Sequence, residues 1–336
     1  MRARRLVSAW SVGAAIIAAL VVAGIAYGST PLAFGDVARA LAQSLLPGLD
    51  TGVSPAVMRI VIDLRLPRVL LAICVGSGLA VVGALLQTTT RNDLADPFLF
   101  GLSSGAAAGA VSVITFFGDR LGVWTLPTAA FIGALLSAGA VLALISAQRD
   151  KGPERLVIAG LAVSFLFGAI TTYLVFAGDQ RAAHSVLFWS VGGLGLASWS
   201  NLPLGLAGAA VAVGTGIVLR HRLDALLSGE DTALSLGIDV PRLRFTVFAL
   251  SALATAALVS LSGVIGFVGL MVPHLARAMV GVRHGALIVT ATIIGAIMLL
   301  AGDLASRVVL APQELPVGII TAAAGALFVL GVVLKR

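Results

Sequence analysis

Two long hydrophobic stretches of this chain contain helix-breaking and charged residues, and they restrict its fold more than any other feature. They cover residues 65–110 and 266–301, and the second holds Pro273, His274 and Arg277 between apolar residues. A membrane anchor needs only apolar residues, whereas polar and helix-breaking residues at membrane depth cost free energy. Such residues usually mark a pathway, a helix interface or a broken helix, so we expect more than an anchor.

The composition is that of an integral membrane protein. The chain is 59% hydrophobic and 11% charged, with a mean hydropathy of +1.07, whereas soluble domains carry roughly 25% charged residues. Its single cysteine, Cys74, excludes a disulfide framework. The net charge of +7 does not come from a basic patch interleaved with aromatic residues, so no nucleic acid partner is predicted. We therefore expect one polytopic, all-α membrane domain over residues 1–336.

The pattern of apolar runs predicts nine or ten transmembrane helices. A helix that crosses the hydrocarbon core needs about 20 apolar residues. Charge-free runs occupy residues 6–35, 69–90, 97–118, 121–148, 156–178, 182–219, 245–276, 284–302 and 315–334. Pro203 and the glycines before it restrict the sixth crossing to about residues 200–219. Gly263 and Gly266 can divide the seventh run into two spans.

The distribution of basic residues favours ten crossings over nine, because it requires an even number. Both termini are basic, which places both in the cytoplasm if the positive-inside rule holds. Ten spans then assign 15 basic residues to the inside and 7 to the outside. Three of the outer residues, Arg65, Arg68 and Arg307, lie at span ends where the rule disfavours cations. Snorkelling explains Arg65 and Arg68 most simply, and an i,i+4 salt bridge with Asp303 explains Arg307.

The sequence gives little sign of bound cofactors or of catalysis. The four histidines form no HxxxH pair, and none lies near Cys74, so no metal site is predicted. The two lysines, Lys151 and Lys335, do not fit the P-loop pattern GxxxxGK[ST]. Any ATP and Mg²⁺ should therefore be bound by a partner, and the chain itself should not be an enzyme.

The longest cytoplasmic segment, residues 220–244, is amphipathic. Leu223, Leu226 and Leu227 share one helical face, and Ser228 and Gly229 break the helix. A second turn opens with acids that suit a helix N-terminus, and Gly237 can cap its end. This second turn contains Glu230, Asp231, Ala233, Leu234 and Leu236. The segment is either a solvated loop or a docking surface for a partner.

Several small or polar residues lie inside or beside the spans. Asp96 is a good N-cap and Pro97 a good first helical residue, so the third span should start there. The polar start of this span, with Ser103 and Ser104, permits close helix packing or a hydrophilic path. His274 follows Pro273, which frees a backbone carbonyl that His274 or a neighbour could satisfy.

Taken together, seven motifs resemble one family of permeases. They are RLPR at 65–68, GALLQ at 83–87, RNDLADP at 91–97, GLSSGA at 101–106, GEDTALSLGIDV at 229–240, GFVGLMVPHLAR at 266–277 and ELPVG at 314–318. The sequence resembles the permease subunits of ATP-binding-cassette importers for iron–siderophore complexes, haem and vitamin B12, over roughly residues 65–336. Asp93 departs from the family, which usually has proline after the preceding asparagine.

The resemblance implies a fold, a set of partners and functional residues. It implies ten transmembrane helices per subunit, related as inverted repeats, in the cytoplasmic membrane. Two such subunits would assemble with two cytoplasmic ATPase subunits and an extracytoplasmic substrate-binding protein. The resemblance implies that residues 220–244 couple to the ATPase and that Arg65, Arg68 and Arg307 dock the binding protein. Because a large cargo needs a wide, weakly binding route, we expect the path to be lined by the third, fifth, eighth and tenth spans. The candidate polar positions are Ser103, Ser104, Ser164 and His274.

Two other classes of function fit the sequence less well. An ion-coupled secondary transporter needs carboxylates inside the membrane, but Asp63, Asp303 and Glu314 lie near span ends. A membrane-embedded enzyme would need a nucleophile–base pair or an HExxH motif, and neither is found. The cargo is not predicted, because siderophore, haem and B12 permeases share these motifs.

Overall fold

The computed structural model describes residues 2–46, 48–117, 122, 124–147, 152–178, 186–187 and 189–334, with side chains from residue 6 onward except that of residue 333. Within these ranges the regular structure is helical, as predicted. The elements are α1 (Arg2–Ala26), α2 (Phe34–Leu45), α3 (Pro55–Met58), η1 (Arg59–Arg65), α4 (Leu66–Thr90), η2 (Pro97–Phe100), α5 (Leu102–Phe116), α6 (Thr125–Ser146), α7 (Pro153–Ala177), α9 (Leu202–Leu227), α10 (Glu230–Ser235), α11 (Val240–Ser262), α12 (Val268–Val280), α13 (His284–Val308) and α14 (Val317–Leu334).

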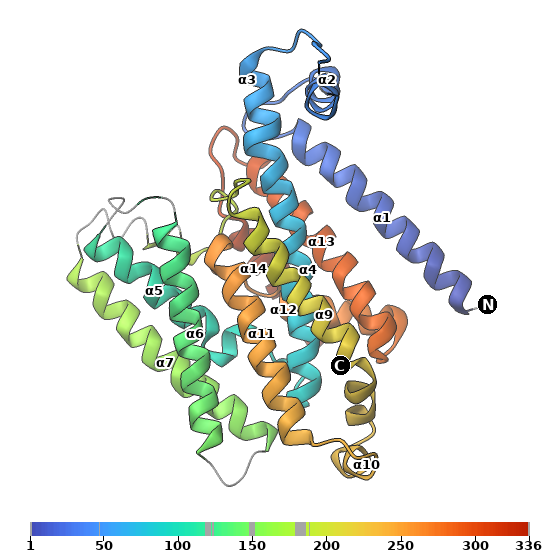
Figure 1. Ribbon diagram of the computed structural model, residues 1–336, viewed down its shortest axis with the longest axis vertical. Helices are drawn as coiled ribbons and strands as arrows, with labels where there is room; N and C mark the ends of the chain where they lie inside the picture. Colours follow the sequence, from blue (N-terminus) through green and yellow to red (C-terminus); the bar gives the residue numbers. More distant parts are fainter. Residues whose placement is uncertain are drawn as a thin grey trace.

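Helix α4 forms the centre of the bundle. It packs against α9, α11, α12 and α13, while α5, α6 and α7 form a group on one side (Figure 1). Most of its side chains are buried, because its sequence is apolar or small on every face. In contrast, α1 lies at the edge of the bundle and leaves much of its apolar surface exposed, which suits a helix that faces lipid.

Seven helical segments of the described chain are long and apolar enough to cross a membrane. They are Leu6–Ala26, Pro55–Thr90, Thr125–Ser146, Pro153–Ala177, Leu202–Leu227, Val240–Ser262 and His284–Val308. Three shorter apolar helices, at 102–116, 268–280 and 317–332, accompany them. The predicted break near Gly263 is confirmed, since α11 ends at Ser262 and α12 begins at Val268. The predicted start of a crossing near residue 200 is also confirmed by α9.

The predicted start of the third span was only partly correct. Asp96 does act as an N-cap, because its Oδ1 accepts the backbone N–H of Phe98 at 2.9 Å. However, the helix that it caps is one 3₁₀ turn, η2, and α5 begins only at Leu102. Gly101 separates the two with a φ of 78°, a left-handed conformation that glycine adopts without strain. Burial raises the pKa of Asp96 to about 6.

Glycine allows α4 and α12 to approach until their backbones touch. A Cβ atom added at Gly83 would lie 1.9 Å from the carbonyl oxygen of Gly269, which is part of the backbone and cannot rotate away. Small residues at helix crossings are the usual means of close packing in membranes. The second motif of the resemblance, GALLQ, therefore begins with a residue that the packing itself requires.

We expect Gly83→Ala to destabilise the protein by about 1–3 kcal/mol, because the added methyl group forces α4 and α12 apart. The matched control is Gly139→Ala on α6, where a Cβ would meet no atom within 4 Å. Thermal unfolding in detergent measures both effects. Equal melting temperatures for the two variants would show that the α4–α12 crossing tolerates the extra volume.

Candidate transport and coupling sites

The predicted coupling segment forms a helix–turn–helix beyond the membrane-spanning part of α9. Helix α9 ends at Leu227, Ser228 follows it, and Gly229 has a φ of 114° before α10 begins at Glu230. Gly237 has a φ of 78°. Its N–H donates to Leu234 O at 2.9 Å, and the N–H of Ile238 donates to Ala233 O at 3.0 Å. These are the two bonds of a Schellman cap, so the predicted break and cap are both confirmed.

The apolar side chains of this segment divide into an inner and an outer set, which corrects the prediction of one docking face. Leu223, Leu226 and Ala233 are buried against the chain's own helices, so they hold the segment in place. The outer set is Leu227, Leu234 and Leu236, which are 43%, 55% and 67% exposed. Leu227 follows Leu226 by about 100° around the helix, so the two point to different surroundings. We call the outer set the exposed leucine patch.

The carbonyl that Pro273 frees is satisfied by Gln87, which sequence reasoning did not single out. Pro273 lies inside α12 and has no N–H for the carbonyl of Gly269, four residues earlier. The Gln87 Nε2 atom lies 3.2 Å from that oxygen and 3.3 Å from the carbonyl oxygen of Leu270. Its Oε1 accepts a hydrogen bond from Arg277. Gln87 thus ties α4 to the interrupted helix, and GALLQ and GFVGLMVPHLAR meet at this point.

His274 does not satisfy the freed carbonyl. Its ring is exposed and packs edge-on against Phe328 of α14, with 5.4 Å between ring centroids. Among the other predicted path residues, Ser103 is buried, Ser104 is half-buried, and Ser164 donates to Phe98 O at 3.3 Å. The contacts described for these four residues join none of them to another, so a shared path stays a prediction.

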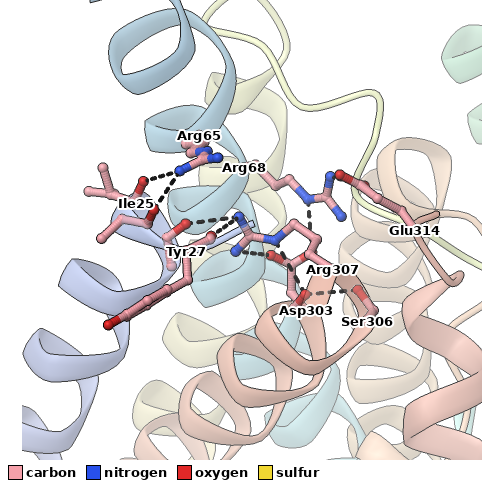
Figure 2. A network of polar contacts seen from close by, with 10 residues as sticks. Ile25, Tyr27, Arg65, Arg68, Asp303, Ser306, Arg307 and Glu314 are labelled. Atoms are coloured by element: carbon pink, nitrogen blue, oxygen red, sulfur yellow. Dashed lines mark hydrogen bonds and ion pairs between the residues drawn. The ribbon is translucent and has the colours of Figure 1, made fainter. Parts of the chain in front are cut away.

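The opposite end of the bundle carries a cluster of buried arginines (Figure 2). Arg65 is 7% exposed and donates to the carbonyls of Ile25 and Ala26, both at 2.8 Å, and to that of Thr30. Arg307 is 2% exposed and donates to Gly24 O at 2.8 Å. The last carbonyls of a helix have no partner within it and carry partial negative charge. These two arginines therefore cap the end of α1.

Two acids offset part of the positive charge of this cluster. Asp303 is fully buried, with Oδ2 2.9 Å from Arg307 Nη2 and Oδ1 2.8 Å from Arg68 Nε. Glu314 lies 2.7 Å from Arg68 Nη1 at a more exposed position. The predicted Asp303–Arg307 pair is confirmed, whereas snorkelling of Arg65 and Arg68 was wrong, because both donate to groups of the chain itself. The cluster borders a cavity of about 260 Å³ that Gly28, Thr30 and Glu314 also line.

The apolar helices, which leave a leucine patch exposed at one end and an arginine-lined cavity at the other, are those of a multi-pass membrane protein. The model of the FecCD transport family matches residues 16–335, and this chain belongs to that family. It is a permease subunit of an ATP-binding-cassette importer, and the alternative of an ion-coupled secondary transporter is not supported. The family consists of transport permeases that are not themselves catalytic.

Similar proteins cover nearly the whole chain. The sequence is 39% identical to the cobalamin import system permease protein BtuC of Halobacterium salinarum, over 84% of this chain and 75% of the relative. It is 37% identical to the hemin transport system permease protein HmuU of Yersinia pestis, over 88% and 90%. A solved structure described as an inward-facing conformation of a putative metal-chelate type ABC transporter superposes with a TM-score of 0.84, at 28% identity, over 98% and 99%.

Proposed function

We propose that this permease moves an iron chelate, haem or cobalamin across the cytoplasmic membrane, using ATP that a partner subunit hydrolyses. The observation that carries the proposal is the similarity, over 84% and 88% of this chain, to permeases named for cobalamin and hemin. These cargoes are large, so a path with small and neutral lining residues suits them better than a charged one. Ser103, Ser104, Ser164 and His274 are our candidates for that lining.

The proposed topology has ten crossings with both termini in the cytoplasm, and two halves related as inverted repeats. The three shorter apolar helices α5, α12 and α14 would complete the seven longer spans. The basic residues near α10, among them Arg91, Arg242 and Arg277, would face the cytoplasm, in agreement with the positive-inside rule. Six residues of the charge count, Arg120, Arg149, Lys151, Arg181, Lys335 and Arg336, lie outside the described residues.

The proposed complex contains a second permease subunit, two ATPase subunits that bind ATP and Mg²⁺, and an external substrate-binding protein. The exposed leucine patch would dock into an ATPase subunit, because apolar side chains at helical spacing beside water suit a partner's groove. The binding protein would meet the arginine-lined cavity. There Arg68 keeps part of its surface exposed, while Arg65 and Arg307 contribute positive potential from buried positions.

Reconstitution tests this function directly. The permease and its cognate ATPase are placed in liposomes, and uptake of haem, cobalamin and a ferric siderophore is measured with the matching binding protein outside. We expect ATP-dependent uptake of one of these cargoes and none with a Walker-A variant of the ATPase. Uptake that depends on an ion gradient and is independent of ATP would reject the proposal.

A further inference from the structure

The coupling segment is attached to the end of α4 through two separate contacts, an ion pair and a hydrogen bond to a histidine. The two acids lie on α10 and at the end of α9, and they contact an arginine and a histidine on other helices. The first pair joins Glu230 of α10 to Arg244 of α11, and the second joins Asp224 of α9 to His284 of α13. Helix α10 lies at the end of the bundle where α4 terminates (Figure 1).

In the first pair, Arg244 bridges α10 and α4. Arg244 is 6% exposed, and its Nη2 lies 2.5 Å from Glu230 Oε1. Its Nε donates to the carbonyl oxygen of Thr89, in the last turn of α4, at 3.0 Å. Glu230 also lies 3.9 Å from Arg91, the C-cap residue of α4. A buried cation held by a carboxylate and a carbonyl has few alternative positions, so α10 and α4 should move together.

In the second pair, His284 bridges α9 and α4. Its Nδ1 lies 2.7 Å from Asp224 Oδ1, and its Nε2 lies 3.0 Å from the hydroxyl of Thr88. The same carboxylate accepts the backbone N–H of His284 at 2.8 Å, which satisfies a free donor at the start of α13. Thr88 and Thr89 are consecutive, so both pairs act on the same turn of α4. Gln87 directly precedes Thr88 and donates a hydrogen bond to the carbonyl of Gly269 in α12. The same part of α4 therefore also contacts the broken helix.

We propose that Asp224 and Glu230 are positioning residues that transmit movement of the coupling segment to α4 through His284 and Arg244. The inference rests on the proposed function, since the movement originates in the ATPase. Either pair alone can hold the segment to α4, because the two run in parallel. Single losses should therefore cost little, and loss of both should uncouple ATP hydrolysis from transport.

The test compares Asp224→Ala, Glu230→Ala and the double variant in liposomes with the ATPase. Asp63→Ala is the matched control, because this exposed acid of η1 lies outside the coupling segment and forms no ion pair in the described part of the chain. We expect the double variant to retain ATPase binding and hydrolysis while cargo moved per ATP falls by at least about tenfold, the change that 1.4 kcal/mol produces. Each single variant should lose about threefold or less, and the control nothing.

Three results would overturn the inference. The first is an unchanged ratio of cargo to ATP in the double variant. The second is a parallel loss of ATPase binding and transport, because the two contacts would then only shape the docking surface. The third concerns Arg244→Lys in the Asp224→Ala background, where only the Arg244 contact remains; lysine keeps the charge but loses the fork geometry, so the same ratio should fall, and a ratio equal to that of Asp224→Ala alone would exclude Arg244 as the bridge. Absence of ATP-driven uptake by the wild-type protein would instead reject the proposed function itself.

Discussion

Replacing Leu227 and Leu236 by aspartate is expected to abolish both ATPase binding and transport. Both side chains belong to the exposed leucine patch, and the burial of two carboxylates without partners in an apolar groove costs several kcal/mol. The affinity for the ATPase should fall by at least about a hundredfold. Co-purification and surface-immobilised binding in detergent measure this change.

The matched control is Leu49→Asp, an exposed leucine near α2 at the other end of the bundle. It introduces the same chemical change away from the proposed ATPase surface, so it should leave binding intact. A further comparison is Leu223→Ala, which removes a buried side chain and should lower stability rather than affinity. Wild-type ATPase binding by the double aspartate variant would show that the leucine patch faces something else.

Replacing Asp303 by alanine is expected to destabilise the protein by about 3–5 kcal/mol, because it leaves two arginines without their shared buried acid. Arg68 and Arg307 both contact this carboxylate, which is fully buried. The outer end of α1 should loosen with them, since Arg307 also holds the carbonyl of Gly24. Thermal unfolding in detergent measures the loss of stability, and proteolysis near residue 30 measures the loosening.

Glu314→Ala provides the comparison for this prediction. Glu314 pairs with the same Arg68 but is more exposed, and surface ion pairs contribute about 1 kcal/mol or less. The Glu314 variant should therefore melt close to the wild type. Similar losses in the two variants would mean that burial does not set the strength of these pairs.

The position of the arginines was predictable, but their partners were not. The positive-inside rule marked Arg65, Arg68 and Arg307 as cations that needed compensation. The sequence suggested snorkelling, a local pair or an external acid. The structure supplies the carbonyls at the end of α1, about 40 residues away for Arg65 and about 280 for Arg307. Such distant pairings follow from helix packing, which local patterns do not encode.

The membrane class and most helix boundaries follow from the sequence itself, because apolar run length, glycine, proline and charge act locally on the backbone. The breaks at Gly229 and Gly263 and the cap at Gly237 are of this kind. Only the tertiary structure determined which leucines of residues 220–244 remain exposed. It also determined that Gln87 satisfies the carbonyl freed by Pro273. Those outcomes depend on which helices α4 and α9 pack against, and every unpaired polar group in such a bundle must find its partner in that packing.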